Sequence, residues 1–285
     1  MRRFDFVRPQ SISEAFGLLG EHGERARLLA GGTDLLVGIQ VGKFRPDLLI
    51  SLGRIQDLPA AITEDDGRLR IGAGVILTDL IAHPTVRRSF PALVEAASVV
   101  GSVQIRNRAT LAGNVCNASP AADTVPALLV HRAEVELTGP TGARTVPLGR
   151  FLLGPGRTDR RPDEIVTAIE LPIPGAPLGT SFQRLTRRRG VDLATVNLCC
   201  SVDGEGLIRF AFGAVGPTAV VAEDASGRLA DPTIDPAQRR HALDDLASGI
   251  SPISDVRAGA DYRRAMVGVL SERALTTALT RLETP

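Results

Sequence analysis

The stretch TLAGNVCNASPAAD, residues 110–123, separates two apolar runs and consists almost entirely of small and hydrogen-bonding residues. Side chains this short cannot form a hydrophobic core. Gly113 has no Cβ, so its backbone can approach a ligand closely, and Asn114, Asn117 and Ser119 offer hydrogen-bond donors and acceptors. The pattern indicates either a loop whose amides bind an anionic group or a long surface loop of Asx and Ser turns.

A second stretch, RLLAGGTDLLVGIQVG at residues 27–42, favours the ligand-binding interpretation. It predicts a short apolar strand, a pair of glycines and an apolar helix with Thr33 and Asp34 in its first turn. The start of a helix has unpaired N–H groups and a partial positive charge, which would stabilise a pyrophosphate beside Gly31 and Gly32. Neither a G-x-G-x-x-G fingerprint after a strand nor a P-loop is present. We therefore predict that the two stretches converge on a phosphate group without either common motif.

Length and composition restrict the class of protein. The 285 residues are 44% hydrophobic and 23% charged, as in a globular protein of one large or two moderate domains. The bunching of Pro172, Pro174 and Pro177 favours two domains, because prolines make a stiff linker without ladder hydrogen bonds. A net charge of +1 gives no electrostatic basis for binding nucleic acid. The absence of an apolar leader or of a run of about 18 apolar residues favours a cytoplasmic protein.

The three cysteines, Cys116, Cys199 and Cys200, form no C-x-x-C pair. An iron–sulfur cluster normally needs about four thiolates, so we expect no metal on this chain. Cys199 and Cys200 are neighbours in a predicted strand and should face opposite sides of its sheet. The role of Cys116, inside the small-residue loop, stays open.

Four motifs in chain order carry a family resemblance: AGGTDL at 30–35, NRATLAGNVCNASPAAD at 107–123, RRRGVDLATVN at 187–197 and SPISDVRAGADYRR at 251–264. Together they resemble the FAD-binding medium subunit of the xanthine dehydrogenase and carbon monoxide dehydrogenase family of molybdenum hydroxylases. The resemblance implies an α+β fold that begins with a FAD-binding domain of the PCMH or vanillyl-alcohol-oxidase type. This domain would cover residues 1–172, with subdomains at about 1–55 and 56–172. A smaller α+β domain would cover 176–285, and its apolar pattern predicts a three-stranded antiparallel sheet with helices.

The resemblance also implies that FAD binds between the two N-terminal subdomains. Residues 28–35 would line the pyrophosphate and ribityl chain, and residues 110–114 would donate to phosphate or ribityl oxygens. Asp123 would accept from cofactor hydroxyls, and Arg184 would place a cation beside the flavin. The expected FAD contacts are Leu28, Leu29, Ala30, Gly31, Gly32, Thr33, Asp34, Leu35, Val100, Gly101, Thr110, Ala112, Gly113, Asn114, Asp123, Val166 and Arg184.

Some of these residues allow another interpretation. Asp123 precedes a predicted helix at Thr124 and is a suitable N-cap for it. Val100 stands where the family often has an aromatic residue, and Arg184 where it commonly has lysine. Arg184 and the arginines at 187–189 alternatively form a solvated face or a subunit contact.

The family resemblance implies a role in electron transfer. Substrate would be oxidised at a molybdopterin site on a large partner, and two [2Fe-2S] clusters on a small partner would pass the electrons to FAD on this chain. The acceptor could be NAD, quinone or oxygen, and the substrate is not encoded here. Such complexes are usually dimers of heterotrimers. We expect no catalytic side chain, because the four histidines have no partner at a telling spacing. The alternatives are a stand-alone flavin oxidase or reductase and a non-catalytic module of the same fold.

Overall fold

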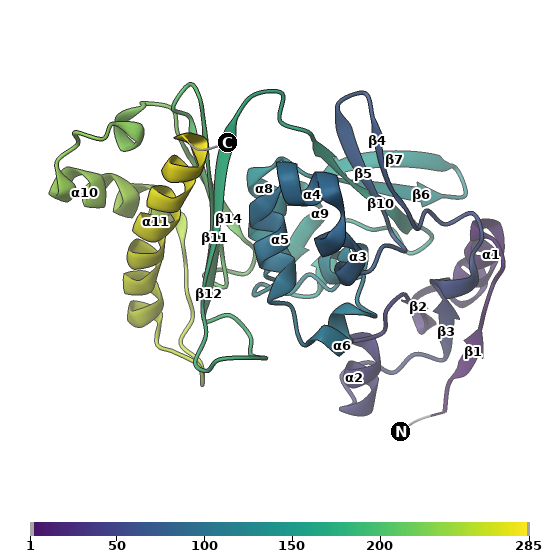
Figure 1. Ribbon diagram of the computed structural model, residues 1–285. Coiled ribbons are helices and arrows are strands. Elements are labelled where there is room, and N and C mark those ends of the chain that lie inside the picture. Colours follow the sequence, from purple (N-terminus) through teal and green to yellow (C-terminus); the bar gives the residue numbers. More distant parts are fainter. Residues whose placement is uncertain (1–2, 284–285) are drawn as a thin grey trace.

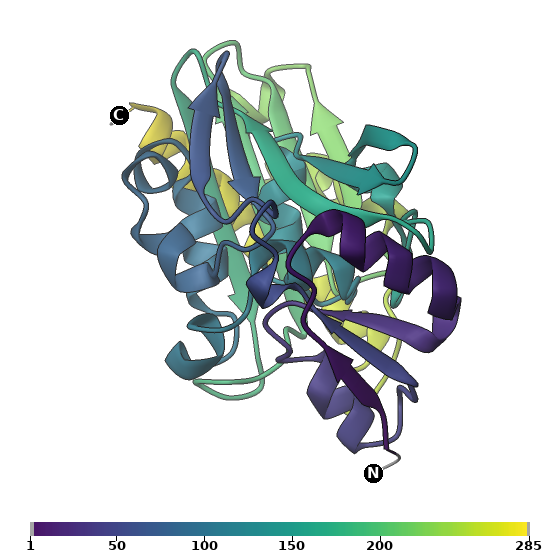
Figure 2. The same cartoon turned by 90° about the vertical axis from the view of Figure 1, so that its right-hand side faces the viewer.

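The computed structural model describes residues 3–283, and its first part is a small parallel sheet. The strands lie in the order β1 (Asp5–Val7), β3 (Leu48–Ser51) and β2 (Ala26–Leu29). Helix α1 (Ile12–His22) packs against β2 and β3, and the short helix α2 (Leu35–Gln40) follows β2 (Figure 2). Ser11 caps α1, since its Oγ accepts from the N–H of Glu14 at 3.1 Å. The short strand and the helix predicted within residues 27–42 are therefore present as β2 and α2.

The middle of the chain forms a five-stranded antiparallel sheet with helices beside it (Figure 1). Its strands lie in the order β4 (Ile62–Asp65), β5 (Arg68–Gly72), β10 (Ile165–Pro172), β6 (Glu134–Gly139) and β7 (Gly142–Pro147). Alternate residues of β6 are buried, as expected for a strand with one face on the core. The helices are α3 (Leu77–Ala82), α4 (Pro84–Ser89), α5 (Pro91–Ser98), α6 (Val103–Arg106), α7 (Leu111–Cys116), α8 (Thr124–Val130) and α9 (Leu148–Phe151), and a hairpin of β8 (Leu152–Gly154) and β9 (Arg157–Thr158) follows.

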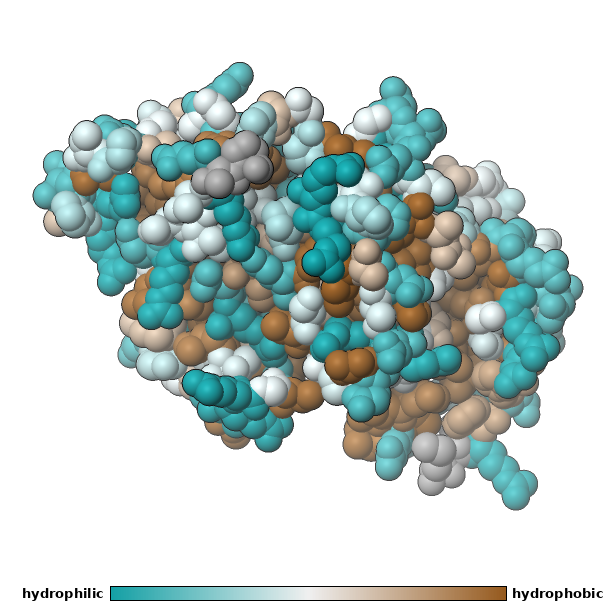
Figure 3. All heavy atoms as spheres, viewed as in Figure 1, coloured by the Kyte–Doolittle hydropathy of each residue, from teal (hydrophilic) through white to brown (hydrophobic). Residues whose placement is uncertain are grey.

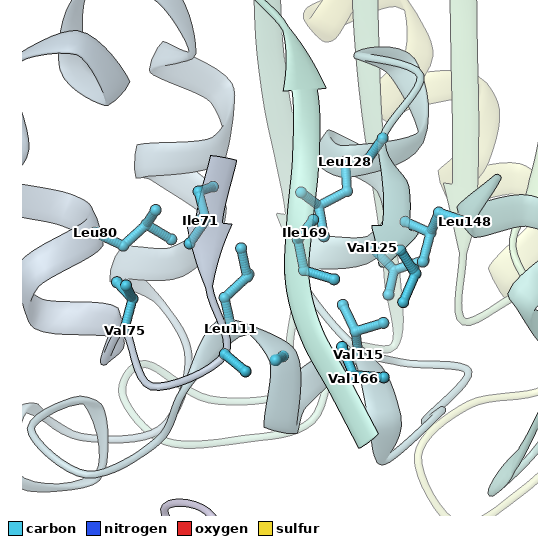
Figure 4. Close-up of a cluster of buried hydrophobic side chains, with 14 of the residues drawn as sticks. Ile71, Val75, Leu80, Leu111, Val115, Val125, Leu128, Leu148, Val166 and Ile169 are labelled. Atoms are coloured by element: carbon cyan, nitrogen blue, oxygen red, sulfur yellow. The ribbon is translucent and has the colours of Figure 1, made fainter. Parts of the chain in front are cut away.

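The core of this part is continuous between the sheet and the helices (Figure 4). Ile71 and Ile169 from neighbouring strands are fully buried, as are Leu111 and Val115 from α7 and Leu128 from α8. Burying aliphatic side chains of this size stabilises the fold by about 1.5–3 kcal/mol each. Helix α7, which lies in the small-residue stretch, is thus held firmly on its apolar side.

The last part is a four-stranded antiparallel sheet of β11 (Leu178–Leu185), β12 (Val196–Asp203), β13 (Ile208–Gly213) and β14 (Val220–Asp224). The prediction of three strands was wrong, because β14 is a short edge strand in which no residue is fully buried. Helices α10 (Pro236–Leu246) and α11 (Ala260–Glu283) cover one face, and α5 and α8 lie against the other (Figure 1). The remaining elements are four single 3₁₀ turns, η1 (Gly23–Arg25), η2 (Leu52–Arg54), η3 (Arg228–Ala230) and η4 (Ala247–Gly249).

Strand β12 shows how the C-terminal sheet is shared between two cores. Cys199 belongs to the core that includes α5 and α8, whereas Cys200 belongs to the core under α11. The prediction that these cysteines face opposite sides is confirmed. Polar contacts add to this attachment, since the N–H of Phe182 donates to Glu95 Oε2 at 3.0 Å and the N–H of Ala214 donates to Pro120 O at 2.7 Å. The sheet therefore lies firmly on the helices that carry the small-residue stretch.

No helix within residues 3–283 has both the length and the apolar character needed to cross a membrane.

Candidate functional site

The glycine turn after β2 packs directly on the backbone that leads into α7. A Cβ on Gly31 would lie 2.1 Å from the carbonyl oxygen of Arg108 and 2.9 Å from Cα of Ala109. Gly32 has φ +77°, a left-handed conformation that glycine adopts without strain. On the other side of the contact, the position of a Gly113 Cβ is 3.9 Å from Cβ of Ala30. The predicted convergence of the two stretches is thus confirmed.

The turn has a run of free backbone donors. Within residues 3–283, the N–H groups of residues 31–35 donate to no protein acceptor. Helix α2 begins at Leu35, so the expectation that Thr33 and Asp34 lie in its first turn was wrong. Asp34 takes the N-cap position, but its side chain caps no amide, and burial raises the pKa of its carboxyl while Lys43 opposes the rise. Successive free amides of this kind suit an anionic group.

The second stretch uses many of its donors internally. Thr110 caps α7, because its Oγ1 accepts from the N–H of Gly113 at 3.0 Å, and its carbonyl accepts from the N–H of Asn114. The N–H of Leu111 donates to Val75 O. Within the described chain, the N–H of Ala112 and the side-chain NH₂ of Asn114 keep no protein acceptor. Asn114 Oδ1 accepts from Thr124 Oγ1 at 2.6 Å, which fixes the orientation of that amide.

Asp123 ends the stretch as a nearly buried carboxylate, 7% exposed. It occupies the N-cap position of α8, but its side chain accepts no amide of that helix, so the capping interpretation was wrong. Its Oδ1 instead accepts from Asn197 Nδ2 at 2.9 Å and lies 3.3 Å from Arg184 Nε. Its Oδ2 has no protein partner within residues 3–283. Burial raises the pKa of Asp123 to about 6, and Arg184 and Asn197 both oppose the rise.

Arg184 connects Asp123 to a second predicted segment. The Arg184 side chain is 11% exposed, and its Nη1 donates to Val99 O at 3.0 Å, directly before Val100 and Gly101. It also donates to the carbonyl of Asp192. The interpretation of Arg184 as part of a solvated face was therefore wrong, whereas the neighbouring arginines at 187–189 are exposed.

Two known protein families match consecutive parts of this chain. The family described as the FAD binding domain in molybdopterin dehydrogenase matches residues 2–174, and the CO dehydrogenase flavoprotein C-terminal domain matches residues 181–278. The chain is a member of the FAD-binding subunits of molybdenum hydroxylases.

Relatives of this flavoprotein cover nearly its whole length. The carbon monoxide dehydrogenase medium chain of Hydrogenophaga pseudoflava is 34% identical over 98% of both chains. The xanthine dehydrogenase FAD-binding subunit of Escherichia coli O157:H7 is 29% identical over 97% of both. Among solved structures, the Hydrogenophaga pseudoflava carbon monoxide dehydrogenase that lacks the Mo-pyranopterin moiety has a TM-score of 0.91 at 35% identity, with 98% of both chains covered. Quinoline 2-oxidoreductase from Pseudomonas putida 86 has a TM-score of 0.90 at 28% identity, again over 98% of both chains.

The polar groups of the flavoprotein fit FAD. The free amides of residues 31–35 suit its diphosphate, and the open Oδ2 of Asp123 suits a hydroxyl donor. Leu28, Leu29 and Leu35 lie half-buried beside the glycine turn. Val166 is different, since its side chain is 4% exposed and packs in the core near Val115 (Figure 4).

Sequence reasoning missed two residues of this site, Asn197 and Thr124. Nothing in their local sequence pairs Asn197 with a carboxylate 74 positions earlier. Cys116, in the small-residue stretch, has a free thiol. Burial raises the pKa of its thiol to about 11, with Arg160 opposing the rise, so Cys116 is a protonated thiol at neutral pH.

Proposed function

We propose that FAD lies against both converging stretches and under the Arg184 side of the C-terminal sheet. The observation that supports this most strongly is the run of free amides at residues 31–35, packed through Gly31 onto the segment before α7. The proposed contacts are those expected from the sequence, namely Leu28, Leu29, Ala30, Gly31, Gly32, Thr33, Asp34, Leu35, Val100, Gly101, Thr110, Ala112, Gly113, Asn114, Asp123, Val166 and Arg184. The Val166 side chain is 4% exposed, so only a small part of it is open to contact with FAD.

The proposed division of labour follows from the groups present. FAD supplies the redox chemistry when bound, and the protein orients it and sets its electrostatic surroundings. The amides of residues 31–35 bind the diphosphate, while Asp123 Oδ2 accepts a hydrogen bond from a hydroxyl. Arg184 places a positive charge beside Asp123 and the bound cofactor. This charge stabilises negative charge on either group.

We further propose the partners of this subunit. They are a small subunit with two [2Fe-2S] clusters, which supplies electrons, and a large molybdopterin subunit, which oxidises substrate, in a dimer of heterotrimers in the cytoplasm. An exposed apolar surface on and near α2 supports a docked partner; it contains Leu36, Val37 and Val41, which are 44%, 56% and 72% exposed, and Figure 3 shows apolar side chains gathered there, at the lower right. The electrons leave to NAD, quinone or oxygen.

We also propose that residues 1–172 and 176–285 are separate structural domains, with subdomains at about 1–55 and 56–172. The two family matches, to residues 2–174 and 181–278, support a boundary near the proline-rich linker.

Purification of the tagged chain with its genomic neighbours tests the proposed complex. We expect co-eluting subunits that carry iron and molybdenum, with one FAD per copy of this chain. Gly32 and Asn114 variants should lose the flavin absorbance and keep the fold. A preparation without iron and molybdenum, in which the isolated chain turns over a small substrate, would instead favour a stand-alone flavin enzyme. Absence of FAD from the intact complex would contradict the proposal.

A further inference from the structure

Asn197 is a fully buried polar residue on β12. Its Nδ2 donates to Asp123 Oδ1 at 2.9 Å and so joins the C-terminal sheet to the start of α8. Buried polar side chains are costly unless they are hydrogen-bonded. Only part of the hydrogen-bonding capacity of the Asn197 side chain is used, because its Oδ1 is buried without a partner. An apolar residue would avoid this cost, so the bond to Asp123 indicates a positional role.

The fold makes room for this bond at Gly213. Asn197 and Gly213 are paired on adjacent strands, and a Cβ on Gly213 would lie 2.1 Å from Asn197 Oδ1 and 3.1 Å from Cγ of Pro126. The Asn197 side chain therefore lies over the glycine, close to α8, and reaches Asp123 from there. Its NH₂ must face the carboxylate, because the reverse orientation would bring two acceptors together.

One hydrogen-bond donor and one ion-pair partner approach the same oxygen of Asp123. Asn197 Nδ2 and Arg184 Nε lie 2.9 Å and 3.3 Å from Oδ1, and Arg184 is itself fixed on Val99 O. The carboxylate is thus held from the side of the C-terminal sheet, and Oδ2 is left for a ligand. The two groups differ in kind, since Arg184 supplies charge through an ion pair and Asn197 supplies direction through a hydrogen bond.

We propose that Asn197 is a positioning residue of the FAD site, which holds Asp123 ionised and turned so that Oδ2 accepts a hydrogen bond from a cofactor hydroxyl. The inference rests on the proposed function. Asn197 acts through Asp123 and touches neither the cofactor nor a substrate.

The charges around Asp123 make the effect measurable. Arg184 on β11 is the charged side chain that acts on it within the described chain, and it lowers the pKa of Asp123. On other packed elements, Glu95 on α5 pairs with Arg281, and Arg209 on β13 pairs with Glu223. Loss of the Asn197 donor should therefore raise the pKa of Asp123 above its value of about 6.

The experiment is a FAD titration of the deflavinated full-length chain, followed by flavin fluorescence from about pH 5 to 8. In the wild type, FAD affinity should fall with acidification, with a midpoint near the Asp123 pKa. Asn197→Asp keeps the side-chain size but replaces the donor with a second carboxylate, and Asn197→Ala removes the donor. Both should raise the Kd for FAD about 10-fold at pH 7, as for loss of one hydrogen bond to a charged group, and move the midpoint to higher pH.

Arg209→Gln is the matched control, because Arg209 also ties the sheet to α8, at the opposite end, by donating to Leu129 O at 3.4 Å. It should keep the affinity and midpoint of the wild type. Asn197 variants with unchanged affinity and midpoint, even if they melt earlier, would overturn the positioning role. A wild-type chain that binds no FAD would instead overturn the proposed function, which keeps the two failures distinct.

Discussion

Gly31→Ala is the most direct test of the contact between the two stretches. The added Cβ would lie 2.1 Å from Arg108 O and 2.9 Å from Cα of Ala109, and both are backbone atoms that cannot rotate away. The two segments must separate by about 1 Å, a form of overpacking that typically costs about 1–3 kcal/mol. A diphosphate held by amides on one segment and donors on the other would lose optimal contact with one of them. We expect the Kd for FAD to rise by about 10-fold to 100-fold.

The assay combines FAD titration with denaturant unfolding of the FAD-free chain. Gly20→Ala is the control, because it adds the same methyl group in α1, where nothing lies within 4 Å of the new Cβ. It should leave FAD affinity unchanged and stabilise the helix slightly. If Gly31→Ala folds and binds FAD as tightly as the control does, the two segments do not grip the cofactor together.

Three further predictions concern buried ionisable groups. Asp123→Asn removes a carboxylate whose pKa is raised to about 6. The wild type should therefore lose roughly 1–3 kcal/mol of unfolding free energy relative to the variant as the pH rises from about 4 to 7. Urea titrations without FAD measure this loss, and parallel curves for the two proteins would argue against it. His131→Leu should show the opposite sign, because burial lowers the pKa of His131 to about 4; the wild type should lose roughly 1–3 kcal/mol relative to the variant as the pH falls from about 6.5 to 4. Arg184→Met should weaken FAD binding at pH 7 about 10-fold. Arg184→Lys keeps the charge but loses the planar fork of the guanidinium, so it should bind FAD with intermediate affinity. Equal FAD affinities for the wild type, Arg184→Met and Arg184→Lys would show that the cation plays no part.

The regular elements were predictable because their patterns are local. The buried run of β10 and the long helix α11 have the lengths and apolar spacing that distinguish strand from helix. Strand β14 escaped detection because it is five residues long and lies at a sheet edge, where burial leaves a weak trace in the sequence. The start of α2 was placed too early because glycine turns and helix starts favour the same small polar residues.

The candidate site was predictable only in part. Small residues and paired glycines indicate where backbone must approach a ligand, so the convergence of the two stretches followed from composition. The fate of Asp123 did not follow, because an aspartate before a helix either caps it or turns away. Here Asn197 and Arg184 decide between these outcomes, and both lie far along the chain on a sheet that folds back over α8.

Strand β12 has a consequence for how the molecule melts. One row of its side chains completes the hydrophobic centre beneath α11, and Cys199 on the other row helps to close the centre around α5 and α8. Because β12 contributes to both hydrophobic cores, unfolding of either core exposes apolar side chains of the other. Calorimetry of the chain should therefore show one cooperative peak, although the polypeptide matches two separate family descriptions.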